Sequence, residues 1–104
     1  MDRTPLRSAD YRLPARLARH VKARDQYCTF PDCRRLANDC DSDHLDPWPA
    51  GATCINNLAS ECRHHHLAKH GYFTVRRTPD GYLHWTSPHG LTVSRPPRAL
   101  LRGW

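Results

Sequence analysis

Apolar residues along this chain recur with two spacings, which divide it into helical and extended segments. Over residues 14–25, Leu17 and Val21 lie four positions apart and Arg24 continues their stripe, which is the spacing of one helix face. Pro14 suits the first turn of a helix, because the N–H that it lacks would have no partner there. The pattern therefore predicts a helix that begins near residue 14 and ends near residue 25.

A second helix is predicted in the middle of the chain, where the sequence reads NNLASECRHHHLAKHG. Asn57 at its start is a favoured capping residue, and Gly71 just beyond its end is a common helix stop. Lys69 and His70 place positive charge in the last turn, where the helix dipole favours it. We therefore expect a helix that begins near Asn57 and ends at His70.

Extended segments account for most of the remaining pattern. Residues 72–78 and 82–87 read as two strands joined by a Pro-Asp-Gly turn at 79–81, and residues 89–94 can add a third strand. Between the two helices, residues 34–45 carry apolar side chains spaced as in a short strand. The elements together predict an α+β fold.

The predicted elements form one small domain over residues 13–94, with an N-terminal tail at 1–12 and a C-terminal tail at 95–104. Only 38% of the residues are hydrophobic and the mean hydropathy is −0.79, so burial alone gives a marginal core. Small domains of this kind often add disulfides or a metal, and this chain has five Cys and eight His. Since five cysteines leave one unpaired, a metal is favoured over a disulfide scaffold.

The charge of the chain points to a nucleic-acid partner. The formal charge is +6, and 14 of the 16 basic residues are Arg, whose planar fork matches phosphate geometry. A GC-rich genome would also explain the ratio of Arg to Lys, but it would not explain the excess of positive charge. The N-terminus has no apolar signal segment and no apolar run reaches membrane-spanning length, so we expect a cytoplasmic protein with reduced thiols and no membrane partner.

Two Cys/His pairs have the spacing of metal half-sites. One pair flanks a Pro-Asp turn at positions 28 and 33, and the other lies at positions i and i+3 of the second predicted helix. The four residues are Cys28, Cys33, Cys62 and His65. Four nitrogen and sulfur ligands suit tetrahedral Zn²⁺, which would clamp the turn to the helix, although the same residues could also be present without a metal. Cys40 and Cys54 have no such partner and are predicted to be small buried apolar residues.

A second metal centre is predicted on another face of the same helix. His66 and His70 lie at i and i+4, turned by roughly a quarter of a circle from the first pair, and His64 points elsewhere, to solvent or to a ligand. With Asp43 they would offer two imidazoles and a carboxylate to a divalent ion that stays open to substrate. His44 would face the other side of the strand and could take a proton from water.

Each of these features has a simpler interpretation when it is taken alone. An isolated Asp-His pair most often lies on a polar surface without a catalytic role. Asn57 could hold a ring nitrogen of His44 and so set its tautomer, or it could only cap the helix. The order and spacing of the residues together favour the catalytic interpretation.

The pair Asp43-His44, followed by Asn57 and His66 and enclosed by the four candidate zinc ligands, resembles the HNH endonuclease family and its ββα-metal core. More narrowly, the chain is similar to the HNH module at the C-terminal end of many actinobacterial proteins. The resemblance extends over residues 13–91 and includes the cysteine turn and the hairpin. Departures are an Ala-Gly-Ala sequence at 50–52, Glu61 in place of a usual Leu, and the lack of the long N-terminal region.

The resemblance implies a role for each matching residue. His44 would be the general base, Asn57 would orient it, and Asp43 and His66 would bind one catalytic ion, either Mg²⁺, Mn²⁺, Ni²⁺ or Zn²⁺. His70 matches a further ligand that only part of the family has. The implied activity is hydrolysis of phosphodiester bonds in DNA, most simply double-stranded DNA, by an HNH endonuclease.

Several features bear on how such a domain would bind DNA. The candidates for phosphate contacts are Arg63, Lys69, Arg76 and Arg77. A solvated charged surface is an equally simple interpretation of these four side chains. Tyr82 and Trp85 could stack on bases, but we expect them to pack in the core, and Trp48 has no assigned role.

The main alternative to an enzyme is a catalytically inactive, zinc-stapled module that binds nucleic acid. A zinc protease is a weaker alternative, because the chain has no H-E-x-x-H motif. The pattern leaves open DNA against RNA, nicking against double-strand cleavage, sequence specificity, and whether a homodimer or another protein partner is needed.

Overall fold

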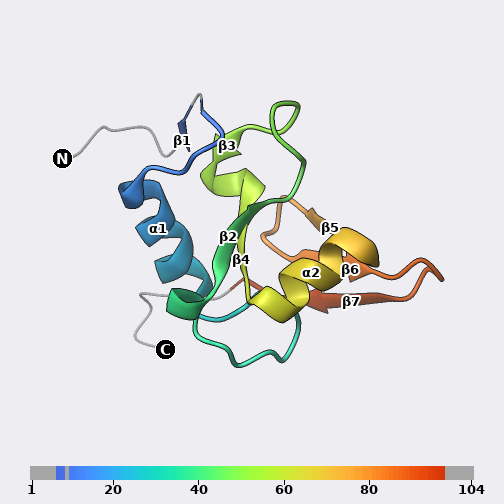
Figure 1. The fold of residues 1–104 in the computed structure, drawn as a ribbon. Coiled ribbons are helices and arrows are strands. Elements are labelled where there is room, and N and C mark those ends of the chain that lie inside the picture. The colour runs from blue at the N-terminus through green and yellow to red at the C-terminus, as the bar shows by residue number, and fades with distance from the viewer. Residues whose placement is uncertain (1–6, 9, 98–104) are drawn as a thin grey trace.

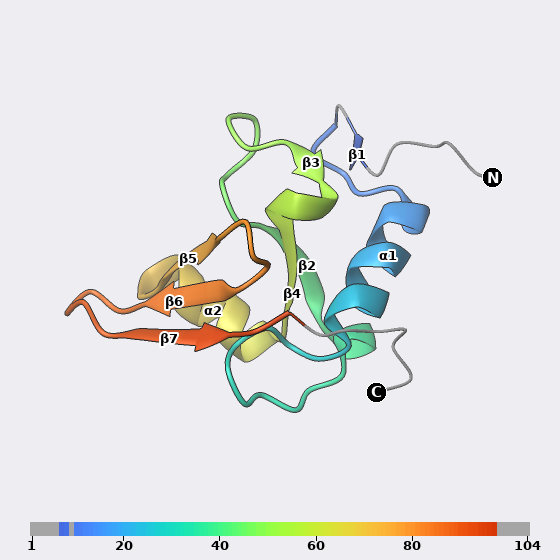
Figure 2. The ribbon, with the colours of Figure 1, turned by 180° about the vertical axis from the view of Figure 1, so that it is seen from behind.

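The computed structural model describes residues 7–8 and 10–97 and shows a small mixed α/β fold. The helices and strands are, in chain order, β1 (Arg7–Ser8), α1 (Ala15–Asp25), η1 (Ala37–Asp39), β2 (Asp41–His44), β3 (Thr53–Cys54), η2 (Ile55–Asn57), β4 (Leu58–Glu61), α2 (Arg63–Gly71), β5 (Thr74–Arg77), β6 (Leu83–Thr86) and β7 (Thr92–Arg95). The antiparallel pair β2–β4 lies between α1 and α2, as the two opposite views show (Figures 1 and 2). The candidate functional residues come mainly from β2, β4 and α2.

The first predicted helix is confirmed as α1. Pro14 precedes its first residue with an extended backbone, and the helix ends at Asp25. Leu17 and Val21 are buried, and both pack against Leu58 of β4. Two aliphatic side chains one helical turn apart therefore anchor α1 to the central strand pair.

The second predicted helix is confirmed only in its second half. A start near Asn57 is wrong, because α2 begins at Arg63 with Cys62 as its capping residue. Residues 58–61 instead form β4, whose backbone pairs with β2. All four residues of β4 are buried, since α1 and α2 both pack against the strand. Burial on both faces removes the alternation of apolar and polar residues by which a strand is recognised.

The C-terminal hairpin and its third strand are confirmed as the sheet β5-β6-β7. At the turn, the Gly81 N–H donates to the Thr78 carbonyl at 2.8 Å, and Gly81 has a φ of 91°, which favours glycine. Trp85 is fully buried as expected, but Tyr82 is 39% exposed, so its placement in the core was wrong. Leu83 and Trp85 face the core together, and Tyr82 is an odd number of positions from both.

The strand predicted over residues 34–45 is shorter than expected. Only Asp41–His44 pair as a strand, because residues 37–39 form the turn η1. Within the predicted N-terminal tail, β1 pairs with β3. Residues 98–104 of the predicted C-terminal tail lie outside the described residues. Across the described ranges, neither helix has the length and apolar character needed to cross a membrane.

Candidate metal centres

The first centre is a cluster of three cysteines and one histidine that could hold a structural metal such as zinc. The predicted ligands Cys28, Cys33, Cys62 and His65 offer atoms that all lie within 4.8 Å of one another. The His65 Nδ1 atom lies 3.2 Å from the Cys62 sulfur and 3.4 Å from the Cys28 sulfur. A metal here would join the cysteine turn to the first turn of α2, as the spacing predicted.

The surroundings of this cluster suit a bound cation. The ring of Phe30 stacks on His65 with centroids 4.1 Å apart, so the imidazole has a fixed plane. Burial raises the pKa of the Cys28 thiol above its ordinary value. A coordinated metal removes this obstacle, because it binds the thiolate and displaces the proton.

The two other cysteines do not join the cluster. Cys40 is buried, as predicted, and its thiol donates to the Leu36 carbonyl at 3.3 Å. Cys54 is only half-buried, in β3. All five cysteines lie within the described residues and are free thiols.

The second centre lies where β2 faces α2. Ligand atoms of Asp43, His66 and His70 lie within 4.8 Å of one another, so the structure brings together the three residues predicted from the sequence. The His66 Nε2 atom is 3.3 Å from the Asp43 Oδ1 atom. His70 is exposed and the other two are half-buried, which leaves this centre accessible from solvent.

Asp41 belongs to this centre and was missed in the sequence. Its Oδ2 atom lies 2.7 Å from the His66 Nδ1 atom. If the Nδ1–H group donates there, the lone pair on the His66 Nε2 atom faces the Asp43 carboxylate. Two acceptors that face each other in this way can bind a cation together. Asp41 and Asp43 are two residues apart on β2 and face α2 together. The D-x-D spacing on a predicted strand was the sequence feature that could have placed Asp41 at this centre.

Lys69 occupies a different place from the one predicted. Its ammonium group donates to the Asp43 Oδ2 atom at 2.6 Å and to the His44 carbonyl at 2.9 Å, and only 11% of the side chain is exposed. Burial acts to raise the pKa of Asp43, but hydrogen bonds from Lys69 and Glu61 and the positive charge of Lys69 outweigh burial and lower that pKa. Lys69 therefore supports the Asp43 carboxylate from inside, and an open phosphate contact was the wrong prediction.

His44 lies on the other side of β2 and is 6% exposed. Its Nε2 atom is 2.7 Å from the Thr53 hydroxyl, and the ring of Tyr11 stacks on it with centroids 5.2 Å apart. Trp48, which had no assigned role, meets Tyr11 edge-on. Burial lowers the pKa of His44, which favours the neutral form that can accept a proton.

Asn57 holds a loop, and both predictions for its side chain were wrong. It does not cap α2, and among the described residues its hydrogen bonds go to backbone groups and not to His44. The Oδ1 atom accepts the Asp46 N–H at 2.9 Å, and the Nδ2 group donates to the carbonyls of Asp46 and Ala52. A Cβ atom at Gly51 would lie 2.1 Å from the Asp46 carbonyl oxygen, so this closed loop requires glycine. Thr53, at the end of the loop, contacts His44 in the way expected of Asn57.

Replacement of Asn57 by Ala is expected to lower the free energy of unfolding by about 1–3 kcal/mol, because backbone groups of the loop lose their partners. Urea denaturation of the zinc-loaded protein measures this change. Asn56→Ala is the matched control, since Asn56 is exposed and none of the described side-chain bonds depends on it. Equal stability of the two variants would contradict this role for Asn57.

Glu61 is a further acidic residue near this centre. It is fully buried in β4, and its carboxyl group can donate to the Asp43 carboxylate only when it holds a proton. Burial and the nearby charge of Asp43 raise its pKa to about 9, so the group holds a proton at neutral pH. The sequence feature that could have identified Glu61 is an acidic residue within the otherwise small and apolar segment LASE of β4.

The other candidate phosphate contacts fall into two classes. Arg63 is 74% exposed and pairs with Asp41 at 3.2 Å, and Arg76 is also exposed. Arg77 faces inward, and its Nη1 atom donates to the Asn56 carbonyl at 2.9 Å. His64 is exposed on α2. The structure thus leaves Arg63 and Arg76 as outward-facing candidates.

Comparison with known proteins finds similar sequences in Mycobacterium tuberculosis. The chain is 45% identical over 89 residues to the uncharacterized protein Rv2100 of strain H37Rv, which covers 84% of this chain and 16% of the relative. It is 42% identical over 98 residues to the uncharacterized protein Rv3776 of the same strain, which covers 90% of this chain and 19% of the relative. The chain therefore spans less than a fifth of the length of these relatives. No family model matches the chain, and no solved structure matches it.

Proposed function

We propose that this chain is a metal-dependent HNH endonuclease domain that hydrolyses phosphodiester bonds in DNA. The observation that carries the proposal is that ligand atoms of Asp43, His66 and His70 lie within 4.8 Å of one another. His44 is the next residue of β2 after Asp43. The chain order β2, β4, α2 agrees with the ββα-metal core that the resemblance implies. The positive charge of the chain favours a polyanionic substrate.

The residues of the second centre fit a catalytic divalent ion. One carboxylate and two imidazoles suit Mn²⁺, Ni²⁺ or Zn²⁺, and Mg²⁺ can bind with fewer protein ligands and more water. Asp41 holds His66 through its Nδ1 atom, as second-layer carboxylates do at metal sites. When bound, the ion would supply positive charge to the scissile phosphate and the leaving oxygen.

Asp43 and His44 can have separate roles, one as a metal ligand and one as a base, because neighbouring residues of a strand face opposite sides. Asp43 faces α2 and would bind the ion together with His66. His44 would not bind the ion and could take a proton from the attacking water. The Thr53 hydroxyl and the Tyr11 ring keep the His44 imidazole in one orientation. Arg63 and Arg76 would contact phosphates outside the reacting group.

Incubation of the zinc-loaded protein with supercoiled plasmid tests the proposal. Mg²⁺, Mn²⁺, Ni²⁺ or Zn²⁺ is added in turn, and we expect conversion to the open-circular form, because one centre cuts one strand. Cleavage should stop when the added ion is chelated. If every metal leaves the plasmid intact while the protein retards it on a gel, the chain is the zinc-stapled binding module instead.

Asp41→Asn is expected to weaken binding of the catalytic ion by about 10–100-fold, because an amide holds His66 less firmly than a carboxylate does. Titration of the zinc-loaded protein with Mn²⁺ measures this affinity. Asp39→Asn, an exposed acid in η1, is the charge-matched control. Equal Mn²⁺ affinity in the Asp41 variant and the wild type would exclude this role.

A further inference from the structure

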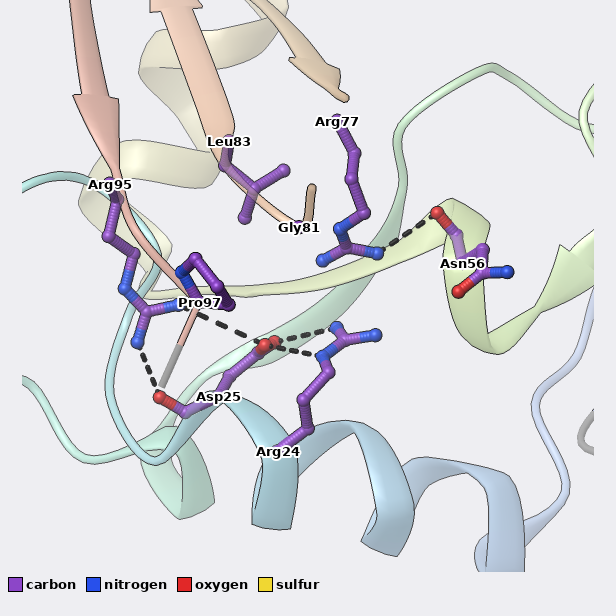
Figure 3. Close-up of a pocket in the computed structure, with 8 residues that line it drawn as sticks. All are labelled: Arg24, Asp25, Asn56, Arg77, Gly81, Leu83, Arg95 and Pro97. Atoms are coloured by element: carbon purple, nitrogen blue, oxygen red, sulfur yellow. Dashed lines mark hydrogen bonds and ion pairs between the residues drawn. The ribbon is translucent and has the colours of Figure 1, made fainter. Parts of the chain in front are cut away.

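A pocket away from both metal centres gathers three arginines. It lies between the C-terminal end of α1, the short helix η2 and one end of the sheet β5-β6-β7 (Figure 3). Its volume is about 120 Å³. The lining residues are Arg24, Asp25, Asn56, Arg77, Gly81, Leu83, Arg95 and Pro97. None of them belongs to either metal cluster, and the space suits several water molecules or a small ion.

Among the described residues that line this pocket, three carry a guanidinium group and one carries a carboxylate. That carboxylate belongs to Asp25, which is 2% exposed. Its Oδ2 atom already accepts the Ser60 N–H at 2.8 Å and an Arg24 N–H at 3.0 Å. Arg95 donates to the Asp25 backbone carbonyl, while its nearest distance to that carboxylate is 3.9 Å. The Asp25 carboxylate is therefore already engaged by its neighbours, chiefly Arg24.

Arg24 is committed to protein groups. Its Nη1 atom donates to the Ile55 carbonyl at 2.6 Å and its Nη2 atom to the Leu58 carbonyl at 2.7 Å. The Nε and Nη2 atoms also bind the Asp25 carboxylate. Arg24 thus contributes positive charge to the pocket, but most of its N–H groups already donate to protein acceptors.

Arg77 has N–H donors that no described protein group accepts. Its Nη1 atom serves the carbonyls of Ile55, Asn56 and Leu58, and no hydrogen bond among the described residues uses its Nε or Nη2 atom. The second terminal nitrogen points away from Asn56 into the pocket (Figure 3). Burial, and then the charges of Arg24 and Arg95, lower the pKa of Arg77 to about 10, while Asp25 acts to raise it.

We propose that this pocket binds a tetrahedral oxyanion of the phosphate class, with Arg77 as the direct donor and Arg24 and Arg95 as supporting charges. A guanidinium group binds such an anion through two parallel N–H donors. Leu83, which is 2% exposed, gives the pocket an apolar wall, and hydrogen bonds to an anion are stronger beside such a wall than in open water. The anion could come from a nucleic-acid backbone or from free phosphate, and the chemistry of the site is the same for both.

Binding of inorganic phosphate to the zinc-loaded protein tests the site, with chloride at equal ionic strength as the reference. Phosphate should raise the melting temperature in proportion to its occupancy. Arg77→Gln should weaken phosphate binding by about 10–100-fold, the usual effect of losing hydrogen bonds to a charged group. The matched control is Arg19→Gln, which removes the same charge from an exposed position of α1 outside the pocket and should keep the phosphate affinity of the wild type.

A second variant covers the case in which Arg77→Gln does not fold. Asn56→Asp places a negative charge at the rim of the pocket on an exposed residue, so the fold should persist while phosphate binding is lost. Phosphate should still bind when His66 is changed to Ala. That result would separate this pocket from the second metal centre.

A labelled DNA duplex distinguishes the two sources of the anion. If Arg77→Gln weakens duplex binding more than Arg19→Gln does, and phosphate competes with the duplex, the site takes a backbone phosphate. If the two variants bind the duplex equally while only Arg77→Gln loses phosphate, the site takes a free anion. The proposal is overturned if the folded Asn56→Asp and Arg77→Gln proteins bind phosphate as the wild type does, or if the wild type binds no phosphate.

Discussion

Removal of the metal from the cluster of Cys28, Cys33, Cys62 and His65 is expected to unfold the domain. Structural zinc in small domains contributes about 10–16 kcal/mol, whereas the whole stability of a domain is about 5–15 kcal/mol. The apolar core cannot replace this contribution, because the buried clusters in the described residues contain only three or four side chains each. Circular dichroism before and after chelation should show loss of the helix signal, and added zinc should restore it.

Cys62→Ser is expected to have the same effect as chelation, because it removes a ligand that also begins α2. Cys54→Ser is the matched control, since Cys54 is half-buried and lies outside the cluster. We expect the control to bind about one equivalent of zinc tightly and to fold. A Cys62→Ser protein with the helix content and melting temperature of the wild type would show that the cluster does not hold the fold together.

His44→Ala is expected to reduce plasmid cleavage by about 10²–10⁴-fold, the usual contribution of a general base. The expectation rests on the proposed nuclease function. His44 is buried against Thr53 and Tyr11, so its removal also costs some stability. His44→Gln keeps a polar group in the same space and separates the two effects. Both variants should keep their zinc and their affinity for DNA.

The control for His44 is His89→Ala, which removes an exposed histidine from the turn between β6 and β7. Cleavage by this variant should equal that of the wild type. If folded His44→Ala and His44→Gln cleave as fast as this control, His44 is not the base. If the wild type does not cleave, the proposed function fails before His44 can be assessed.

Features that depend on neighbours in the chain were predictable from the sequence. The stripe of Leu17 and Val21 gave the extent of α1, and the Pro-Asp-Gly turn located the hairpin. The spacing of Cys62, His65 and His66 placed ligands on two faces of one helix wherever that helix began. The cluster of three cysteines and one histidine could also be predicted, because each pair of candidate ligands is a local feature of the sequence.

Features that depend on what packs against a residue could not be predicted. Asn57 resembled a helix cap, but β4 follows it because β2, α1 and α2 enclose residues 58–61. Lys69 resembled a surface charge, but Asp43 lies within reach of its ammonium group. In each case a residue distant in sequence supplied the partner.

The sequence by itself determined which chemical groups this protein has and how they are spaced along each helix, strand and turn. The tertiary structure decided which groups meet: Asp41 with His66, Thr53 with His44, and Arg77 with the pocket beside Asp25. The physical reason is that local spacing follows from backbone geometry, which each element carries within itself. The meeting of side chains from separate elements follows from burial and charge over the whole chain, and no single segment contains that information.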